Sequence, residues 1–155
     1  IGNASRQKGV HEVYAALKDE GFELVMSGAR SDAGDLPVKF LRLERADYLL
    51  LLHACDAVIC MSHLEEGWNR IAHEAMLCGT PVVGNGAGGM LELLQGGRQE
   101  VVRDPAALPG AIRKLLDHRA DYAAAGRKFA EQFDLDYFRK SWIEAIDSLQ
   151  IAHQR

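Results

Sequence analysis

Residues 56–92, DAVICMSHLEEGWNRIAHEAMLCGTPVVGNGAGGMLE, carry the pattern that decides the fold. They open with a short apolar run at 57–61, bounded by polar residues, which predicts a buried parallel strand rather than a helix. Asn69 is a favourable N-cap for a helix over 70–78, and Gly79 is suited to end it. A strand followed by a loop and a helix is the building unit of a parallel α/β sheet.

A second strand and a glycine-rich loop complete this stretch. The strand is predicted at 80–83, with Pro81 near its start, where a missing N–H is tolerated. The loop at 84–89 contains four glycines, which allow the backbone to approach a ligand closely. The unit is therefore strand, loop, helix, strand, loop.

Two glutamates of this unit are candidates for ligand binding. Glu66 lies at the carboxyl end of the first strand, where open α/β sheets bind their ligands. Glu74 borders the apolar stripe of the following helix. There its carboxylate can stabilise the first turn through the helix dipole, or it can bind a ligand. Together the two carboxylates can hold one polar ligand over a helix N-terminus that favours phosphate.

The rest of the chain predicts an α/β fold, a doubly wound parallel sheet of about six strands with helices on both faces. Ile1 and Gly2 are expected to end a central first strand whose earlier residues are absent. Further strands are predicted at 22–28, 38–43 and 99–102. Further helices are predicted at about 9–19, 46–55, 104–118, 119–133 and 135–153.

Length and composition favour one domain, residues 1–155, which is large enough to bury a core without metal or disulfide support. The chain is 48% apolar and 26% charged, an ordinary globular composition. A net charge of −4 disfavours nucleic acid or an anionic membrane as the main partner. No run reaches transmembrane length, and the start lacks a signal-peptide layout.

The cysteines and histidines suggest neither disulfides nor a metal. Three cysteines lie in apolar contexts without a C-x-x-C pair, which indicates reduced core residues of a cytoplasmic protein. His63 and His73 flank the loop that carries Glu66, but their spacing fits no standard metal site. The four leucines at 49–52 are expected in the core. So are four aromatic residues near the C-terminal end, Phe133, Tyr137, Phe138 and Trp142.

Near the start, Arg6 and Lys8 lie in a turn between a strand and a helix. Basic groups at such a turn suit a diphosphate, although solvated surface charge is the more frequent explanation for such a turn in isolation.

With these blocks in place, the chain resembles the donor-binding, C-terminal half of a retaining glycosyltransferase of the GT-B type, family 4-like (glycosyl transferases group 1). Glu66 and Glu74, with seven residues between them, match the family's E-x7-E motif. The sequences GTPVV at 79–83 and GGMLE at 88–92 match the blocks that follow. Three blocks in the family's order within about thirty residues make the resemblance specific, and it extends over nearly the whole chain.

The resemblance implies a nucleotide-sugar-binding, Rossmann-like domain that transfers a hexosyl group with retention of configuration. Glu74 would bind the ribose hydroxyls and Glu66 the hydroxyls of the donor sugar. Lys8, helped by Asn3 or Arg6, would bind the diphosphate, and Lys8 and Glu66 would be the catalytic residues. The family has G-R-x4-K-G at this turn, whereas this chain has Gly2-Asn3-x4-Lys8-Gly9.

The resemblance also assigns roles to two backbone segments. Arg42 and Leu43 would form the turn that lies against the nucleotide base. Backbone N–H groups facing the sugar or phosphate would come from Gly67, Trp68, Asn69, Arg70 and Ile71. No metal or other cofactor is expected, and a UDP-, GDP- or ADP-hexose would be the substrate.

The expected partner is an N-terminal acceptor domain of the same protein, to which the last helix would cross back. The isolated chain is therefore expected to bind a nucleoside diphosphate weakly and to transfer no sugar. Two alternatives remain open. One is a non-catalytic nucleotide- or partner-binding module of the same fold, favoured by Asn3 in place of arginine. The other is half of a sugar-nucleotide epimerase.

Overall fold

The computed structural model of the protein describes residues 6–28 and 36–152. Its five strands are β1 (Val25–Ser27), β2 (Lys39–Leu41), β3 (Val58–Cys60), β4 (Val82–Gly84) and β5 (Glu100–Val101). Its helices are η1 (Arg6–Lys8), α1 (Val10–Leu17), α2 (Arg45–Ala54), α3 (Arg70–Leu77), α4 (Met90–Gly96), η2 (Pro105–Ala107), α5 (Leu108–Asp117), α6 (Arg119–Ala130) and α7 (Leu135–Ala152). Every strand overlaps a range predicted from the sequence.

The described strands form two parallel sheets instead of one. β1 pairs with β2, and β3, β4 and β5 pair in that order, so β4 is bonded on both sides. The single sheet of about six strands is therefore not confirmed. In a doubly wound order the predicted first strand would lie between β1 and β3. Its expected last residues, Ile1 and Gly2, lie outside the described part of the chain.

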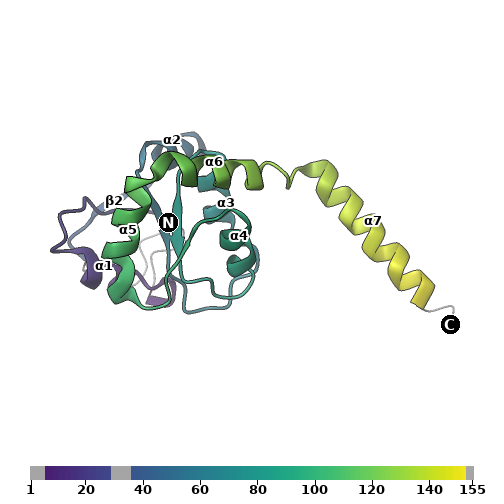
Figure 1. The fold of residues 1–155 in the computed structure, drawn as a ribbon, viewed down its shortest axis with the longest axis horizontal. Coiled ribbons are helices and arrows are strands. Elements are labelled where there is room, and N and C mark those ends of the chain that lie inside the picture. Colours follow the sequence, from purple (N-terminus) through teal and green to yellow (C-terminus); the bar gives the residue numbers. More distant parts are fainter. Residues whose placement is uncertain (1–5, 29–35, 153–155) are drawn as a thin grey trace.

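Helices cover both faces of the strands, as predicted (Figure 1). One apolar cluster joins Leu52 of α2, Met76 of α3 and Leu93 of α4, and all three side chains are fully buried. A second cluster joins Leu17 of α1 to Leu115 of α5 on the opposite face. The two clusters hold the strands as a middle layer.

The run of leucines at 49–52 is only partly in this core. Leu52 is fully buried, whereas Leu50 is 66% exposed. Because successive helical residues turn by about 100°, four consecutive leucines cannot all face one side of α2. The prediction that the whole run packs inside is therefore wrong for Leu50.

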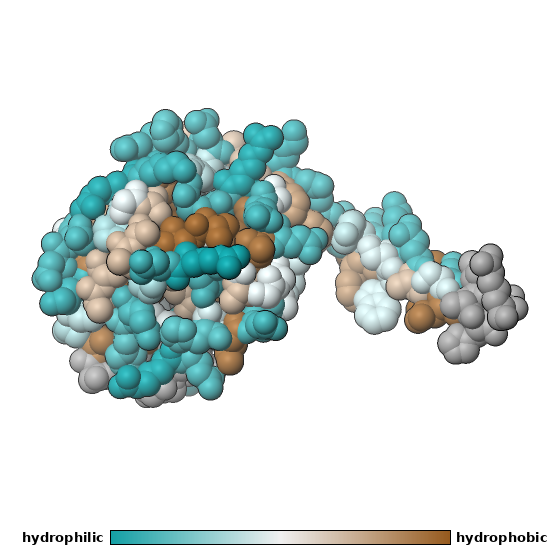
Figure 2. Space-filling view, turned by 60° about the horizontal axis from the view of Figure 1, so that its bottom comes forward, coloured by the Kyte–Doolittle hydropathy of each residue, from teal (hydrophilic) through white to brown (hydrophobic). Residues whose placement is uncertain are grey.

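Helix α7 leaves the body of the molecule, and its apolar side chains are exposed (Figures 1 and 2). Tyr137, Phe138 and Trp142 are 49%, 57% and 55% exposed, so the expected aromatic core is wrong for these three residues. Phe133 precedes the helix and does pack, with its ring centroid 5.0 Å from those of Phe129 and Tyr137. Among the described helices, none combines the length and apolarity needed to cross a membrane.

Candidate functional site

The predicted site residues gather on loops that follow the carboxyl ends of the strands. Glu66 follows β3, Gly88 follows β4, and Arg42 and Leu43 follow β2. β3 and β4 are parallel, so the loops that carry Glu66 and Gly88 leave one edge of their sheet, and open α/β sheets bind ligands at that edge.

Lys8 is held beside the loop after β3 by its neighbours in the chain. The His63 N–H donates to the Gln7 carbonyl at 2.8 Å. Gly9 has φ +65°, and a Cβ atom there would lie 2.1 Å from the Met61 carbonyl oxygen. Only glycine permits this close approach of the two backbones. The contact places Lys8, the last residue of η1, beside the loop after β3.

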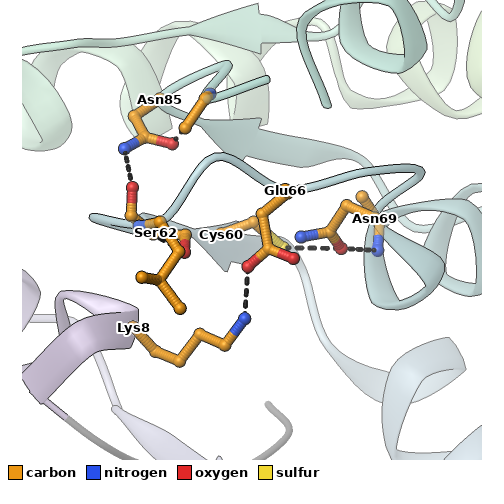
Figure 3. A network of polar contacts seen from close by, with 9 residues as sticks. Lys8, Cys60, Ser62, Glu66, Asn69 and Asn85 are labelled. Atoms are coloured by element: carbon orange, nitrogen blue, oxygen red, sulfur yellow. Dashed lines mark hydrogen bonds and ion pairs between the residues drawn. The ribbon is translucent and has the colours of Figure 1, made fainter. Parts of the chain in front are cut away.

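The Lys8 ammonium and the Glu66 carboxylate form an ion pair (Figure 3). The Glu66 side chain is 18% exposed and that of Lys8 is 35% exposed. Burial opposes ionisation of Glu66, but hydrogen bonds from Lys8 and Ser62 outweigh it, so its pKa is lowered. The site therefore holds the Lys8 side chain in contact with a glutamate whose lowered pKa keeps it ionised at neutral pH.

Asn69 caps α3 as the sequence predicts. Its side-chain oxygen accepts a hydrogen bond from the Ala72 N–H at 2.9 Å, and the residue is buried. The cap fixes where α3 begins, directly after the loop that carries Glu66. The predicted backbone donors of residues 67–71 thus surround a helix N-terminus, which favours anions.

The glycine-rich loop packs against the backbone of Glu66. Gly89 N–H donates to the Glu66 carbonyl at 2.7 Å, and Glu66 N–H donates to the Ala87 carbonyl at 3.3 Å. Gly88 has φ +63°, and a Cβ atom there would lie 2.2 Å from the Glu66 carbonyl oxygen. The loop thus supports Glu66 through backbone contacts that exclude a side chain.

Asn85 joins the same two loops and was missed by the sequence reasoning. Its side-chain amide donates to the Ser62 carbonyl (Figure 3). Its backbone N–H donates to the Cys60 carbonyl at 3.1 Å. Its side-chain oxygen accepts from the Ala87 N–H at 3.3 Å. The available signal was a polar residue directly after a buried strand.

Glu74 lies apart from the Lys8 pair, between α3 and the start of α2. Arg45 Nη1 lies 3.0 Å from Glu74 Oε1, and Arg70 Nε lies 3.7 Å from the same oxygen. The Glu74 side chain is 12% exposed. The bond to Glu74 is also the main reason that the pKa of Arg45 is raised. Arg45 was not foreseen, because nothing in the local sequence links it to Glu74.

Trp68 anchors the Glu66 loop to α6. Its indole N–H donates to His73 Nδ1 at 3.1 Å, and His73 Nε2 lies 2.9 Å from the Ala130 carbonyl oxygen. Since a carbonyl can only accept, His73 carries its proton on Nε2. The Trp68 ring also packs on Phe133, with a centroid distance of 4.6 Å.

The remaining predicted residues lie on the surface or outside the described chain. Arg6 is exposed in η1, Arg42 is exposed and Leu43 is half-buried after β2. Asn3 lies outside the described residues.

No cluster that could hold a metal occurs in residues 6–28 and 36–152. His63 pairs with Glu12 at 3.2 Å instead of turning toward Glu66.

A cavity of about 390 Å³ opens between β1 and β3, and both strands line it. Lys8 and Glu66 are among its polar lining residues, whereas most of the described lining is apolar. Glu74 and the glycine-rich loop are not among its described lining residues. The cavity therefore coincides with the gap between the two sheets, and it meets the candidate site only at the Lys8–Glu66 pair.

Comparison with known proteins places the chain in a family. Residues 2–118 match the family described as Glycosyl transferases group 1. The chain is 33% identical to a glycogen synthase of Mycobacterium tuberculosis over 175 aligned residues, which include the whole chain and 42% of that protein. It is 36% identical to a D-inositol 3-phosphate glycosyltransferase of Geodermatophilus obscurus, over 64% of this chain and 21% of that protein.

Solved structures agree with this relationship. HepE of Anabaena in complex with UDP superposes with a TM-score of 0.79 at 28% identity, over 95% of this chain and 48% of that one. A second HepE structure contains UDP-glucose and gives a TM-score of 0.77. Sucrose-phosphate synthase of Thermosynechococcus elongatus shares the fold, with a TM-score of 0.76 at 21% identity over 97% of this chain and 45% of that one. The chain spans less than half the length of these relatives.

Proposed function

Because the chain belongs to the glycosyl transferases group 1 and has the fold of one half of a GT-B glycosyltransferase, we propose that it binds the nucleotide-sugar donor of a retaining hexosyltransferase. The other half would supply the acceptor site, since the relatives are more than twice as long as their matching regions. No resident cofactor or metal enters this proposal, because the nucleotide sugar is the substrate.

The observation that carries the proposal is the Lys8–Glu66 pair beside the capped N-terminus of α3. A diphosphate needs cationic and N–H donors, and sugar hydroxyls need a carboxylate acceptor. Both requirements meet at this pair. When a donor binds, the Lys8 ammonium would turn from Glu66 to the diphosphate and leave the Glu66 carboxylate for the sugar.

The same groups suit the chemistry of transfer. When the bond between the sugar and the diphosphate breaks, negative charge grows on the departing phosphate oxygen. Lys8 and the backbone N–H groups of residues 67–71 would stabilise that charge without reorganising. Asn3 or Arg6 would assist Lys8, and Arg42 and Leu43 would lie against the base. Glu74 would bind the ribose.

UDP-glucose is the donor to test first, because HepE, which is 28% identical, has been crystallised with UDP and with UDP-glucose. The whole site would close only when the acceptor half covers it and excludes water. We therefore expect the isolated chain to bind UDP weakly and to transfer no glucose.

Calorimetric titration of two variants with UDP and with UDP-glucose tests the assignment. Glu74→Ala should weaken both ligands equally, by roughly 1.5–3 kcal/mol, the range for hydrogen bonds to a charged group. Glu66→Ala should leave UDP affinity nearly unchanged and weaken UDP-glucose alone. Glu131→Ala is the control, because it also removes an arginine-paired glutamate, an exposed one at the C-terminal end of α6.

Three outcomes would contradict the proposal. Equal losses for both ligands in both variants would mean that the roles of the two glutamates are wrongly divided. An absence of saturable binding by the unaltered chain would overturn donor binding itself. Glucose transfer by the isolated chain at the rate of a two-domain enzyme would overturn the need for a second half.

A further inference from the structure

The Glu74 carboxylate is held by one oxygen only. Both arginine contacts, from Arg45 and from Arg70, end on Oε1. Oε2 has no hydrogen-bond or ion-pair partner among the residues that the structure describes. A carboxylate can accept about four hydrogen bonds, so half of the capacity of Glu74 is left for a ligand.

Of the two arginines, Arg45 is the anchor. Its Nη1 is within hydrogen-bond distance of Oε1, at 3.0 Å, whereas Arg70 Nε lies at 3.7 Å. The Arg70 side chain is 87% exposed, so water screens its charge more strongly than that of Arg45, which is 64% exposed. Glu74 itself is largely buried, and a buried carboxylate requires such a partner.

Arg45 is itself held in place. It is the first residue of α2, and its guanidinium lies over the Tyr48 ring, 5.7 Å from the ring centroid. Stacking on an aromatic face restricts the rotation of an arginine side chain. Arg45 also directly follows the turn that contains Arg42 and Leu43. It therefore connects that turn to Glu74.

The Tyr48 hydroxyl is a second donor beside this carboxylate. It is buried and has no hydrogen-bond partner in the described part of the chain. Burial, and then the neighbouring Glu74 carboxylate, raise the pKa of Tyr48 above its ordinary value, so the hydroxyl keeps its proton. This hydroxyl is therefore an alternative partner toward which the Glu74 carboxylate could turn, and Arg45 opposes that turn by holding Oε1.

We propose that Arg45 is a positioning residue, which holds Glu74 by Oε1 so that Oε2 accepts a hydrogen bond from a ribose hydroxyl of the nucleotide. This inference rests on the proposed function, in which Glu74 binds ribose. If the Arg45–Glu74 contact only joined α2 to α3, its loss would not change which nucleotide binds. Arg45 would determine how strongly the site prefers a ribonucleotide to a deoxyribonucleotide.

The test compares UDP with its 2′-deoxy and 3′-deoxy analogues by titration of the full chain, followed by NMR because binding is expected to be weak. The unaltered chain should bind UDP at least about tenfold more tightly than one of the analogues, as expected for a lost bond to a carboxylate. Arg45→Gln should reduce that preference to less than about threefold, mainly by weakening UDP. Arg45→Lys, which keeps the charge without the planar fork, should give an intermediate preference.

Arg113→Gln is the matched control, because it removes another half-exposed arginine from an ion pair, between Arg113 of α5 and Glu20, which follows α1. It should leave the preference unchanged. Thermal melting of each variant reports any loss of folding, which would weaken all three nucleotides together and leave their ratio intact.

The outcomes separate the two proposals. A full preference for UDP that Glu74→Ala abolishes but Arg45→Gln leaves intact would overturn the role of Arg45 alone. Equal binding of UDP and both analogues by the unaltered chain would overturn ribose recognition by Glu74, and the role of Arg45 with it. No saturable binding of UDP would overturn the proposed function.

Discussion

Glu66 and Lys8 meet across a long stretch of chain and neutralise each other in a partly buried place. Such a pair stabilises the fold modestly, by about 1 kcal/mol at most where water still reaches it. Under the proposed function the pair would have a second role. It would keep the two charged groups in contact until the donor replaces each partner, with its diphosphate at Lys8 and its sugar hydroxyls at Glu66.

The lowered pKa of Glu66 predicts how this pair depends on pH. A carboxyl whose pKa is lower in the folded than in the unfolded state stabilises the fold above the unfolded value. That stabilisation is lost as the pH falls through the folded value. Glu66→Gln should therefore lower the free energy of unfolding by about 0.5–1 kcal/mol at pH 7. The difference should shrink as the pH falls, and it should vanish at an acid pH below the folded-state pKa of Glu66.

Urea denaturation at both pH values measures this difference. Glu65→Gln is the control, because Glu65 is exposed and has no ion pair among the described contacts. A deficit of Glu66→Gln that stays constant from pH 7 to acid would show that the loss comes from packing and not from the charge.

At the scale of elements, the loop after β4 and the loop after β3 act as one unit. Backbone hydrogen bonds join residues 87–89 to Glu66, and Asn85 joins β4 to Ser62. Loops joined in this way hold a functional side chain more rigidly than a single loop would. The glycines of this unit are required by geometry, because two backbones lie in direct contact.

Gly88→Ala should therefore destabilise the protein by about 2 kcal/mol or more, since alanine is strained at positive φ and its Cβ would strike the Glu66 carbonyl. Gly110→Ala is the matched control, and its expected effect on stability has the opposite sign. Gly110 lies exposed in α5 with open space around its Cα. Alanine there should stabilise by about 0.5–1 kcal/mol. Thermal melting compares both, and a neutral Gly88→Ala would contradict the loop contact.

Helix α7, in contrast to these packed loops, makes few contacts with the rest of the molecule. Its first turn contacts Phe133 through Tyr137, whereas Trp142, Ile143 and Ile146 remain about half exposed or more. An amphipathic helix normally buries its apolar face. In the proposed two-domain enzyme this is the helix that would cross to the acceptor half.

At the scale of the whole molecule, the gap between β1 and β3 divides the described strands into two sheets. A strand that pairs on one side only directs alternate backbone N–H groups into the open side. In β3 the Val58 N–H points to β4, where it donates to the Pro81 carbonyl at 2.9 Å. The Ile59 N–H therefore points into the gap.

This arrangement predicts an uneven pattern of amide hydrogen exchange in the isolated chain. The Ile59 amide should exchange at least about tenfold faster than the amides of Val58 and Cys60, since open edges lack the protection of a paired strand. Exchange followed by NMR measures each amide separately. Equal protection of Ile59 and Val58 would show that a strand fills the gap.

Local patterns in the sequence determined the central unit from β3 to β4 almost completely. The Asn69 cap, the end of α3 at Gly79 and both strands were predicted because capping, positive φ and short apolar runs act over a few neighbouring residues. The family followed from the same stretch, because its motif is contiguous.

Only the tertiary structure decided which distant groups meet. No local sequence pattern indicates four features of the structure: the Arg45–Glu74 ion pair, the Lys8–Glu66 ion pair, the exposure of α7 and the gap between the sheets. Each depends on how segments remote in the chain pack against one another. A sequence pattern fixes which face a residue takes on its own element, but the partner on the facing element is chosen by packing.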